Sequence, residues 1–220
     1  MNAKKTIFYG DSTEPDERGR GLEIIQAAAH LFHEKGFHAT SMNDIANAMH
    51  LTKPGLYHYV ESKEELLYAI IDYAMCLLQD VVINPAKAIP NPRQRLDFII
   101  ERHAQLVMGN KVIVILTDDL SGLSAEHYEV VIQHKRNFFQ LLRSTLEELG
   151  AAEKTRALNS TVVAFSIFGA LLWLPRWFNP AGALTPEAII HEVKGLIYHG
   201  IENLPSQTNC ETVIELSGSD

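Results

Sequence analysis

Residues 51–59 concentrate side chains that can bind the backbone of a nucleic acid. Lys53 carries a positive charge that can neutralise a phosphate. Tyr57 and His58 offer hydrogen bonds to phosphate, or rings that stack on a sugar or a methyl group. Gly55 has no side chain, so another backbone can approach it closely. These residue types suit a contact with a nucleic acid if one helix presents them together.

Two short helices joined by a tight turn would present these groups together. Thr52 is the predicted N-cap of a helix over 53–59, and Pro54 then falls in its first turn, where the missing N–H costs no hydrogen bond. The stretch Ser41-Met-Asn-Asp44 has the spacing of a capping box and predicts a helix over 42–49. This is the pattern of a helix-turn-helix, whose second helix places its N-terminal residues on base edges and phosphates. The candidate DNA-binding residues are Ser41, Met42, Asn43, Thr52, Lys53, Pro54, Gly55, Tyr57, His58 and Lys63.

A second group of aromatic and charged residues lies near the end of the chain. Trp173 and Trp177 are four residues apart with Arg176 between them, and a kink at Pro175 would turn both rings and the guanidinium inward. Indole faces would then hold an apolar ligand body while the arginine pairs with a phosphate or carboxylate. The alternative is packing in a dimer interface, where tryptophan and arginine are common anchors.

Histidines supply the remaining candidate ligand and metal contacts. His103 lies on the apolar face of a helix predicted to start at Pro92, where it is either a core residue or a ligand contact, and Phe138 is a further candidate ligand residue. His30, His33 and His38 lie near one another. A metal site needs at least three convergent ligands, so surface histidines are the simpler interpretation. We expect no metal and no other cofactor.

The elements that position these residues are helices throughout. Apolar residues recur at spacings of three and four, and caps and helix breakers divide the chain. Residues 112–116 could alone form a buried strand, but no partner strand is visible, which favours a short helix. The predicted helices span about 21–35, 42–49, 53–59, 62–83, 92–107, 112–116, 124–149, 153–173 and 186–200. We therefore expect an all-α fold of about nine helices.

The predicted domains follow from this pattern and from the charge. Residues 1–17 and 205–220 are polar and predicted to be disordered, 18–63 form the helix-turn-helix domain, and 64–204 form a second helical domain. The formal net charge is −8. Residues 18–60 carry four Lys and Arg against three Asp and Glu, a net of +1, while 64–220 carry 12 against 19, a net of −7. The near-neutral first domain permits nucleic-acid binding.

Cysteine content and apolar runs indicate a soluble cytoplasmic protein. Cys76 and Cys210 fit no metal or redox spacing and suit a reducing compartment. The first residues lack the apolar core of a signal peptide. The longest uncharged run, 157–175, contains Asn, Ser and Thr and is predicted to be a buried helix and not a membrane span.

Motifs of enzymes are missing from the sequence. There is no P-loop, G-x-S-x-G or H-E-x-x-H, and Gly19-Arg-Gly21 lacks the third glycine of a dinucleotide site and follows no predicted strand. The rival to a DNA-binding regulator is therefore a helical, dimeric interaction protein without sequence-specific DNA binding.

Residues 21–67 resemble the DNA-binding domain of the TetR family of repressors. The matching pieces are A-x-x-L-F-x-x-K-G-F over 28–37, T-S-M-N-D-I-A over 40–46 and L-T-K-P-G-L-Y-H-Y-V-E-S-K-E-E-L over 51–66. Val60 departs from the family, which usually has Phe there to wedge the recognition helix against the first helix. The resemblance implies that Tyr57 contacts phosphate and positions the helix. It also implies a homodimer that binds a palindromic operator and encloses a small-molecule effector among its C-terminal helices.

The C-terminal part has a more restricted resemblance. Residues 173–189 read W-x-x-R-W-F-x-P-x-G-x-L-T-P-E-x-I and are similar to TetR-family regulators that respond to acyl-CoA thioesters. An acyl-CoA and an uncharged hydrophobic molecule both remain open as effectors. Either would act by shifting the helix that follows the helix-turn-helix, which changes the spacing of the two DNA-binding domains and releases the operator.

Overall fold

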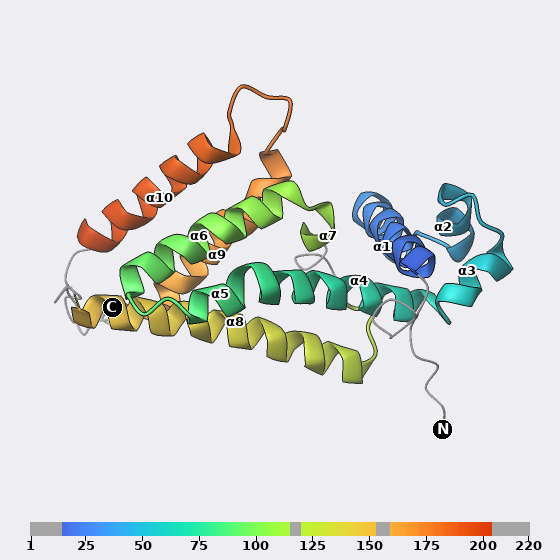
Figure 1. Ribbon diagram of the computed structural model, residues 1–220, viewed down its shortest axis with the longest axis horizontal. Coiled ribbons are helices and arrows are strands. Elements are labelled where there is room, and N and C mark those ends of the chain that lie inside the picture. The colour runs from blue at the N-terminus through green and yellow to red at the C-terminus, as the bar shows by residue number, and fades with distance from the viewer. Residues whose placement is uncertain (1–14, 115–119, 153–158, 204–220) are drawn as a thin grey trace, which may run out of the picture.

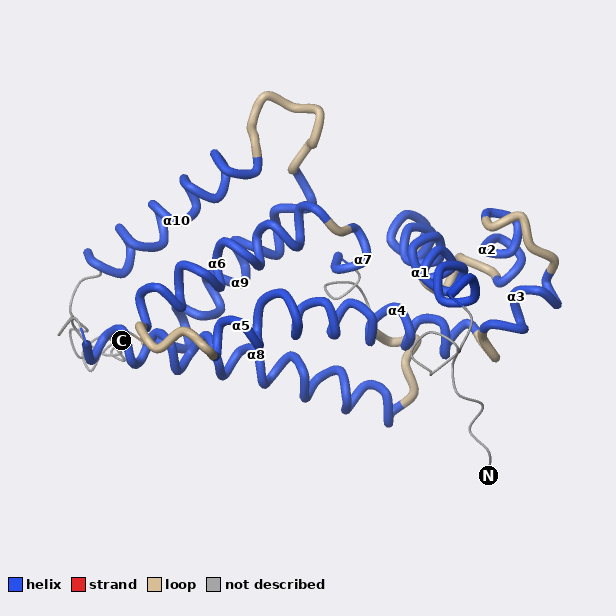
Figure 2. Tube along the Cα trace, in the orientation of Figure 1, coloured by secondary structure: helices blue, strands red, loops and turns tan. Residues whose placement is uncertain are grey.

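The computed structural model describes residues 15–114, 120–152 and 159–203, and these residues form helices joined by short connections (Figures 1 and 2). The segments 1–14 and 204–220, where we expected disorder, lie outside the described residues. The first helix begins at Pro15, so it includes the last three residues of the expected N-terminal arm. The prediction of an all-α fold is confirmed for the described part of the chain.

A three-helix head lies at one end of the molecule (Figure 1). It consists of α1 (Pro15–Lys35), α2 (Met42–Ala48) and α3 (Lys53–Tyr59). Ile24, Ile45 and Leu56, one from each helix, are fully buried and form its core. Val60 is also buried, so the smaller residue at the position of the family's Phe still packs inward.

A long helix leads from the head into the second domain. α4 (Lys63–Leu78) starts at its N-cap Ser62 and continues through a π-helical turn, Gln79–Ile83, into α5 (Asn84–Lys87). The prediction that Asn84-Pro85 ends the helix is wrong. Pro85 lies in the first turn of α5, where a proline needs no N–H, and Asn84 N–H bonds to Gln79 O across the π turn.

The second domain surrounds α6 (Pro92–Gly109) with α8 (Ala125–Ala152), α9 (Ser160–Trp177) and α10 (Pro186–Asn203), and a single turn, α7 (Lys111–Val114), faces the head. α7 confirms the helical interpretation for residues 112–114, and residues 115 and 116 lie outside the described part. Since α5 continues α4, the ten α-helices described make nine separate helical stretches.

The core of the second domain is aliphatic. Fully buried members from α6, α8 and α9 include Leu96, Ile99, Ile100, Leu142 and Leu171. α10 begins as predicted, with Thr185 Oγ1 accepting a hydrogen bond from Ala188 N–H at 3.3 Å. It packs less deeply than the other helices: Ile189, Ile190 and Ile201 are buried, while Leu196 is 76% exposed.

α9 has a largely apolar outer face that is left uncovered by the described part of the chain. Residues exposed along it recur at spacings of three and four: Val162, Phe165, Ser166, Gly169, Ala170, Trp173, Arg176 and Trp177. Among the described residues, two stretches, Lys63–Lys87 and Ser160–Trp177, are long and apolar enough to cross a membrane by length and composition. That test is also passed by core helices, and more than half of the first stretch is buried in the fold.

Candidate nucleic-acid interface and effector site

The turn between α2 and α3 is built by local hydrogen bonds. Ser41 and Asp44 form the predicted capping box, and hydrogen bonds from the Ser41 hydroxyl and then its backbone N–H hold the pKa of Asp44 below its usual value. Thr52 caps α3 as predicted, its hydroxyl accepting from Gly55 N–H at 3.2 Å. The two helices therefore start where the sequence predicts them to start.

The exposed residues of α2 and α3 form one surface of the head. Lys53, Tyr57 and His58 are all exposed on α3, and Tyr57 has 43% of its surface accessible despite its size. The His58 ring meets the Tyr59 ring edge-on with centroids 5.5 Å apart. Of the predicted DNA-binding residues, Ser41, Asn43, Thr52, Lys53, Pro54, Tyr57 and His58 are exposed on the head, and Gly55 is half-buried.

Two predicted DNA contacts point elsewhere. Met42 is buried against the core of the head, because its position in the first turn of α2 faces α1. The Lys63 ammonium donates hydrogen bonds to Phe37 O at 2.9 Å and Thr40 O at 3.0 Å and lies 4.3 Å from the centre of the Phe37 ring. The Lys63 side chain is half-buried and its ammonium is occupied by these groups, so neither Met42 nor Lys63 is placed to contact DNA.

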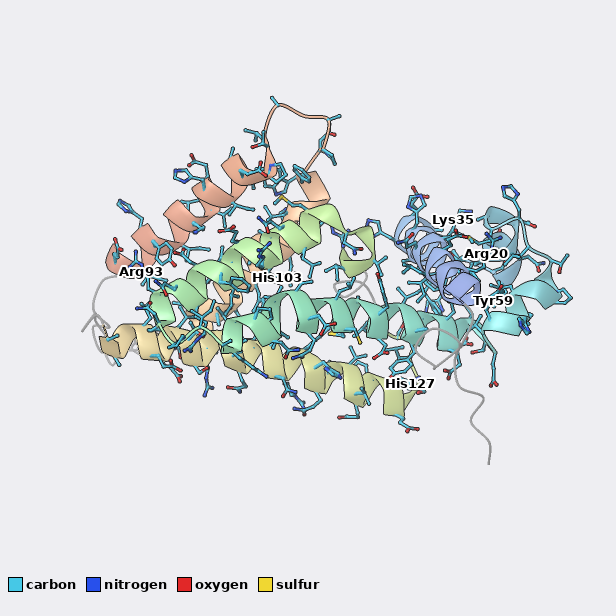
Figure 3. All side chains as sticks on the ribbon, viewed as in Figure 1. Arg20, Lys35, Tyr59, Arg93, His103 and His127 are labelled. Atoms are coloured by element: carbon cyan, nitrogen blue, oxygen red, sulfur yellow. The ribbon has the colours of Figure 1, made fainter. Side chains whose placement is uncertain are left out.

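Two residues that shape this surface have no sequence signal of their own. Arg20 donates to Met49 O at 2.9 Å and to Glu23 at 2.7 Å, which ties α1 to the end of α2 (Figure 3). His50 adopts the left-handed conformation, with φ of 53°, which lets the chain reverse between α2 and α3. Gly or Asn at position 50 would have predicted a left-handed residue in this turn, whereas histidine does not.

The strongest candidate for an effector contact is His103, in the middle of α6 (Figure 3). Its side chain is 2% exposed, and its Nδ1 has no hydrogen-bond partner among the described residues. The rings of Phe138 on α8 and Phe168 on α9 meet it edge-on, with centroids 5.2 and 5.9 Å away. Burial lowers the pKa of His103 to about 4, so the imidazole is neutral at physiological pH.

The expectation that Pro175 turns Trp173, Arg176 and Trp177 inward is wrong for the protomer. α9 continues past Pro175 to Trp177, and Trp173 and Trp177 are 64% and 49% exposed. The Arg176 guanidinium lies 6.0 Å from the centre of the Trp173 ring. These three residues extend the exposed face of α9.

A small open cavity of about 250 Å³ lies between α6 and α10. Glu101 and Gln105 line it from α6, and Glu187, Ile190, His191 and Lys194 line it from α10. Lys194 is already paired with Asp97 at 2.9 Å and with Glu101 at 3.8 Å. The cavity is lined by two glutamates, Glu101 and Glu187, against one lysine, so it does not suit an anionic ligand.

Comparison with known proteins places both domains in one family. Residues 24–70 match the model for bacterial regulatory proteins of the tetR family, and residues 90–201 match the model for the C-terminal domain of tetracyclin repressor-like proteins. The HTH-type transcriptional repressor KstR2 of Rhodococcus jostii is 25% identical over 193 residues, covering 83% of this chain and 91% of the relative. An HTH-type transcriptional regulator from the lacX 3′ region of Lactococcus lactis subsp. lactis is 32% identical over 164 residues, covering 69% and 81%.

A solved structure with a similar fold contains both a small molecule and operator DNA. The crystal structure of AibR in complex with isovaleryl coenzyme A and operator DNA superposes with a TM-score of 0.74 at 32% identity, covering 82% of this chain and 97% of AibR. These relatives are transcriptional regulators, which agrees with the lack of enzyme motifs in the sequence.

Proposed function

We propose that this chain, which belongs to the TetR family of transcriptional regulators and is not an enzyme, represses transcription as a homodimer that binds a palindromic operator and releases it when an effector binds. The observation that carries the proposal is the surface of α2 and α3, where Lys53, Tyr57 and His58 are exposed around a capped recognition helix. We assign DNA binding to residues 18–63, and effector binding and dimerisation to residues 64–204. The regulator acts in the cytoplasm, where its operator lies.

The direct test is binding to the DNA immediately upstream of the gene that encodes this chain. We expect a fluorescein-labelled duplex of that region to give a saturable anisotropy change that an unlabelled copy competes away and a scrambled duplex does not. A folded dimer that binds both duplexes equally weakly at low salt would instead support the alternative, a helical interaction protein without sequence-specific DNA binding.

Lys53→Ala is expected to weaken binding to operator and to scrambled DNA by similar factors. An exposed ammonium that neutralises one phosphate contributes to all sequences alike, and its loss reduces the slope of log K against log salt by about one unit per site. The measurement is a salt titration of DNA affinity, with Lys87→Ala, an exposed lysine at the end of α5, as the control. An unchanged slope would remove Lys53 from the phosphate contacts.

The homodimer is supported by the outer face of α9. An apolar stripe that contains Phe165, Trp173 and Trp177 is unfavourable in water, and a second copy of the same stripe is self-complementary about a two-fold axis. Gly169 and Ala170 lie in its middle, so two α9 helices can approach closely there. Leu196 of α10, 76% exposed, supplies a second apolar contact from the neighbouring helix.

The effector site is proposed among α6, α8 and α9, centred on His103 and Phe138. A neutral imidazole with an unpartnered nitrogen in an aromatic surrounding suits a ligand that is largely apolar and offers one group for hydrogen bonding. The carbonyl of an acyl-CoA thioester is such a group, and AibR, with the similar fold, binds isovaleryl coenzyme A. An uncharged hydrophobic molecule with a carbonyl or hydroxyl is the second candidate.

Native mass spectrometry of the freshly purified dimer separates these two effectors. A retained molecule heavier than coenzyme A supports the thioester. Titration with isovaleryl coenzyme A, with free coenzyme A as control, then tests whether the acyl group lowers operator affinity.

A further inference from the structure

The geometry points to a direct contact between the effector domain and the DNA-binding head, made by residues 120–128, as the element that sets the position of the recognition helix. We call this segment and its partners in the head and α4 the junction. The inference adds a route of regulation to the proposed function and rests on it for its biological meaning. Lys63, Phe37 and Gly122 are its positioning residues, and none of them contacts DNA.

The first contact of the junction is at Phe37, in the turn between α1 and α2. Gly122 lies so close to this ring that a Cβ on Gly122 would be 2.6 Å from Cδ1 and 2.7 Å from Cζ of Phe37, and closer still to Cε1. Its neighbour Ser121 places Oγ 3.2 Å from His38 Nε2. A side chain at 122 would overlap the ring in its present position, so either the ring or the segment would have to shift.

The Phe37 ring is held in place from its other sides. Phe32 meets it edge-on with centroids 5.2 Å apart, and the Lys63 ammonium lies 4.3 Å from its centre. The same ammonium bonds to Phe37 O and Thr40 O, which fixes the turn that leads to the Ser41 cap of α2. A displacement of Phe37 therefore moves the start of α2, and with it α3.

The second contact of the junction is between α8 and α4. The His127 ring stacks on the Tyr68 ring with centroids 3.6 Å apart and planes 4° from parallel, and His127 Nδ1 lies 3.9 Å from Glu65 Oε1 (Figure 3). Burial raises the pKa of Tyr68, as expected for a phenol enclosed between two helices. The first turn of α8 is thus attached to α4, and the segment just before it is attached to the head.

α8 connects the junction to the effector site. The helix is continuous from Ala125 to Ala152, so Phe138, which touches His103, is rigidly linked to His127 across about 17 Å of helix at 1.5 Å per residue. A ligand that moves Phe138 would tilt or shift α8 and transmit that motion to Gly122 and Tyr68 together. The head would respond through Phe37 as well as through α4.

Gly122→Ala is the decisive variant, read out by hydrogen exchange, which needs neither effector nor DNA. We expect exchange of the amides in residues 41–60 to rise about ten-fold because the Cβ forces the head away from residues 120–124, while exchange in α9 stays unchanged. Gly109→Ala is the matched control, since a Cβ there meets nothing within 4 Å. In a Phe37→Ala background the Gly122→Ala substitution should add little, because the ring it overlaps is gone.

An exchange increase confined to residues 120–128, or an equal effect of Gly122→Ala with and without the Phe37 ring, would overturn the inference. Operator affinity is measured on the same proteins, and we expect Gly122→Ala to reduce it about ten-fold through loss of head orientation. If no variant and no wild type binds DNA, the proposed function fails, while the exchange data still decide whether the junction positions the head.

Lys63→Met separates the junction from a phosphate contact. In the wild type the Lys63 ammonium bonds to Phe37 O and Thr40 O. Lys63→Met should therefore lower DNA affinity and raise hydrogen exchange in residues 41–60, while the slope of log K against log salt stays unchanged. A slope that falls by about one unit per site, with exchange unaltered, would instead return Lys63 to the DNA interface and contradict the junction.

Discussion

Ala170→Glu is expected to convert the dimer into a monomer and to abolish operator binding. Ala170 lies in the middle of the exposed apolar face of α9, between Phe165 and Trp173. In a two-fold dimer each copy of the substitution faces the other, so two carboxylates are buried without partners against apolar surface. Leaving one buried charge unpaired costs about 3–5 kcal/mol. Two copies should weaken dimerisation by at least about 1,000-fold.

The substitution is chosen because it leaves the protomer intact. Ala170 is exposed and packs against nothing that defines the core, and glutamate is a good helix former. The measurement is sedimentation equilibrium together with DNA anisotropy. Ala151→Glu, at an exposed position near the end of α8, makes the same chemical change away from the α9 face and should remain dimeric.

Loss of operator binding follows from loss of the dimer, since a palindromic site is read by two heads at a fixed separation. A monomer keeps the phosphate contacts of one head and therefore retains weak binding that is insensitive to sequence. If the Ala170→Glu protein were still dimeric, α9 would not lie in the dimer interface, and the exposed tryptophans would need another partner.

The head could be predicted from sequence because its signals are local. Caps such as Ser41 and Thr52 act within three residues of themselves, and Pro54 is informative because its effect on a helix depends only on its position in the first turn. The burial of Ile25, Ala29 and Phe32 on α1 follows from their spacings of four and three. Local rules therefore give the helix limits and the exposed residues of α3.

The predictions that failed depend on contacts between distant segments. Lys63 reads as a free cation until the turn at Phe37 is placed beside it. Gly122 gives no signal at all, because the ring that it packs against is 85 positions away in the chain. Pro175 suggests a kink, but α9 continues through it. Whether the tryptophans around it face a ligand or a second copy depends on the surroundings of α9, which periodicity does not specify.

His103→Leu is expected to stabilise the protein at pH 7.5 while removing its response to effector. Leucine is apolar, so the substitution removes an unpartnered buried nitrogen, which costs about 1–3 kcal/mol. The contacts with Phe138 and Phe168 are apolar and suit a leucine side chain. Operator affinity without effector should be unchanged, because His103 lies in the second domain, away from the head.

The pH dependence of stability gives a second, independent readout. The folded pKa of His103 is about 4, below the 6.5 of an exposed histidine, so the unfolded chain binds this proton more readily. Protonation of the imidazole therefore contributes no penalty above pH 6.5, and stability falls as the pH drops from 6.5 toward 4. A shift of this size corresponds to roughly 3 kcal/mol for one group. Other titratable groups also make the free energy of unfolding depend on pH, and their contributions cancel in the difference between wild type and variant.

Urea unfolding of both proteins at pH 7.5, 6 and 5 measures that difference. We expect the variant to be the more stable protein at pH 7.5 and its advantage to grow as the pH falls, since leucine has no proton to gain. An advantage that does not change with pH would mean that His103 is partnered or solvated in the folded state. A less stable variant at pH 7.5 would mean that Nδ1 forms a favourable bond in solution, and native mass spectrometry would then distinguish a retained ligand from an internal partner. A polar nitrogen without a partner in an apolar core costs stability, and we therefore expect a ligand to bond to it.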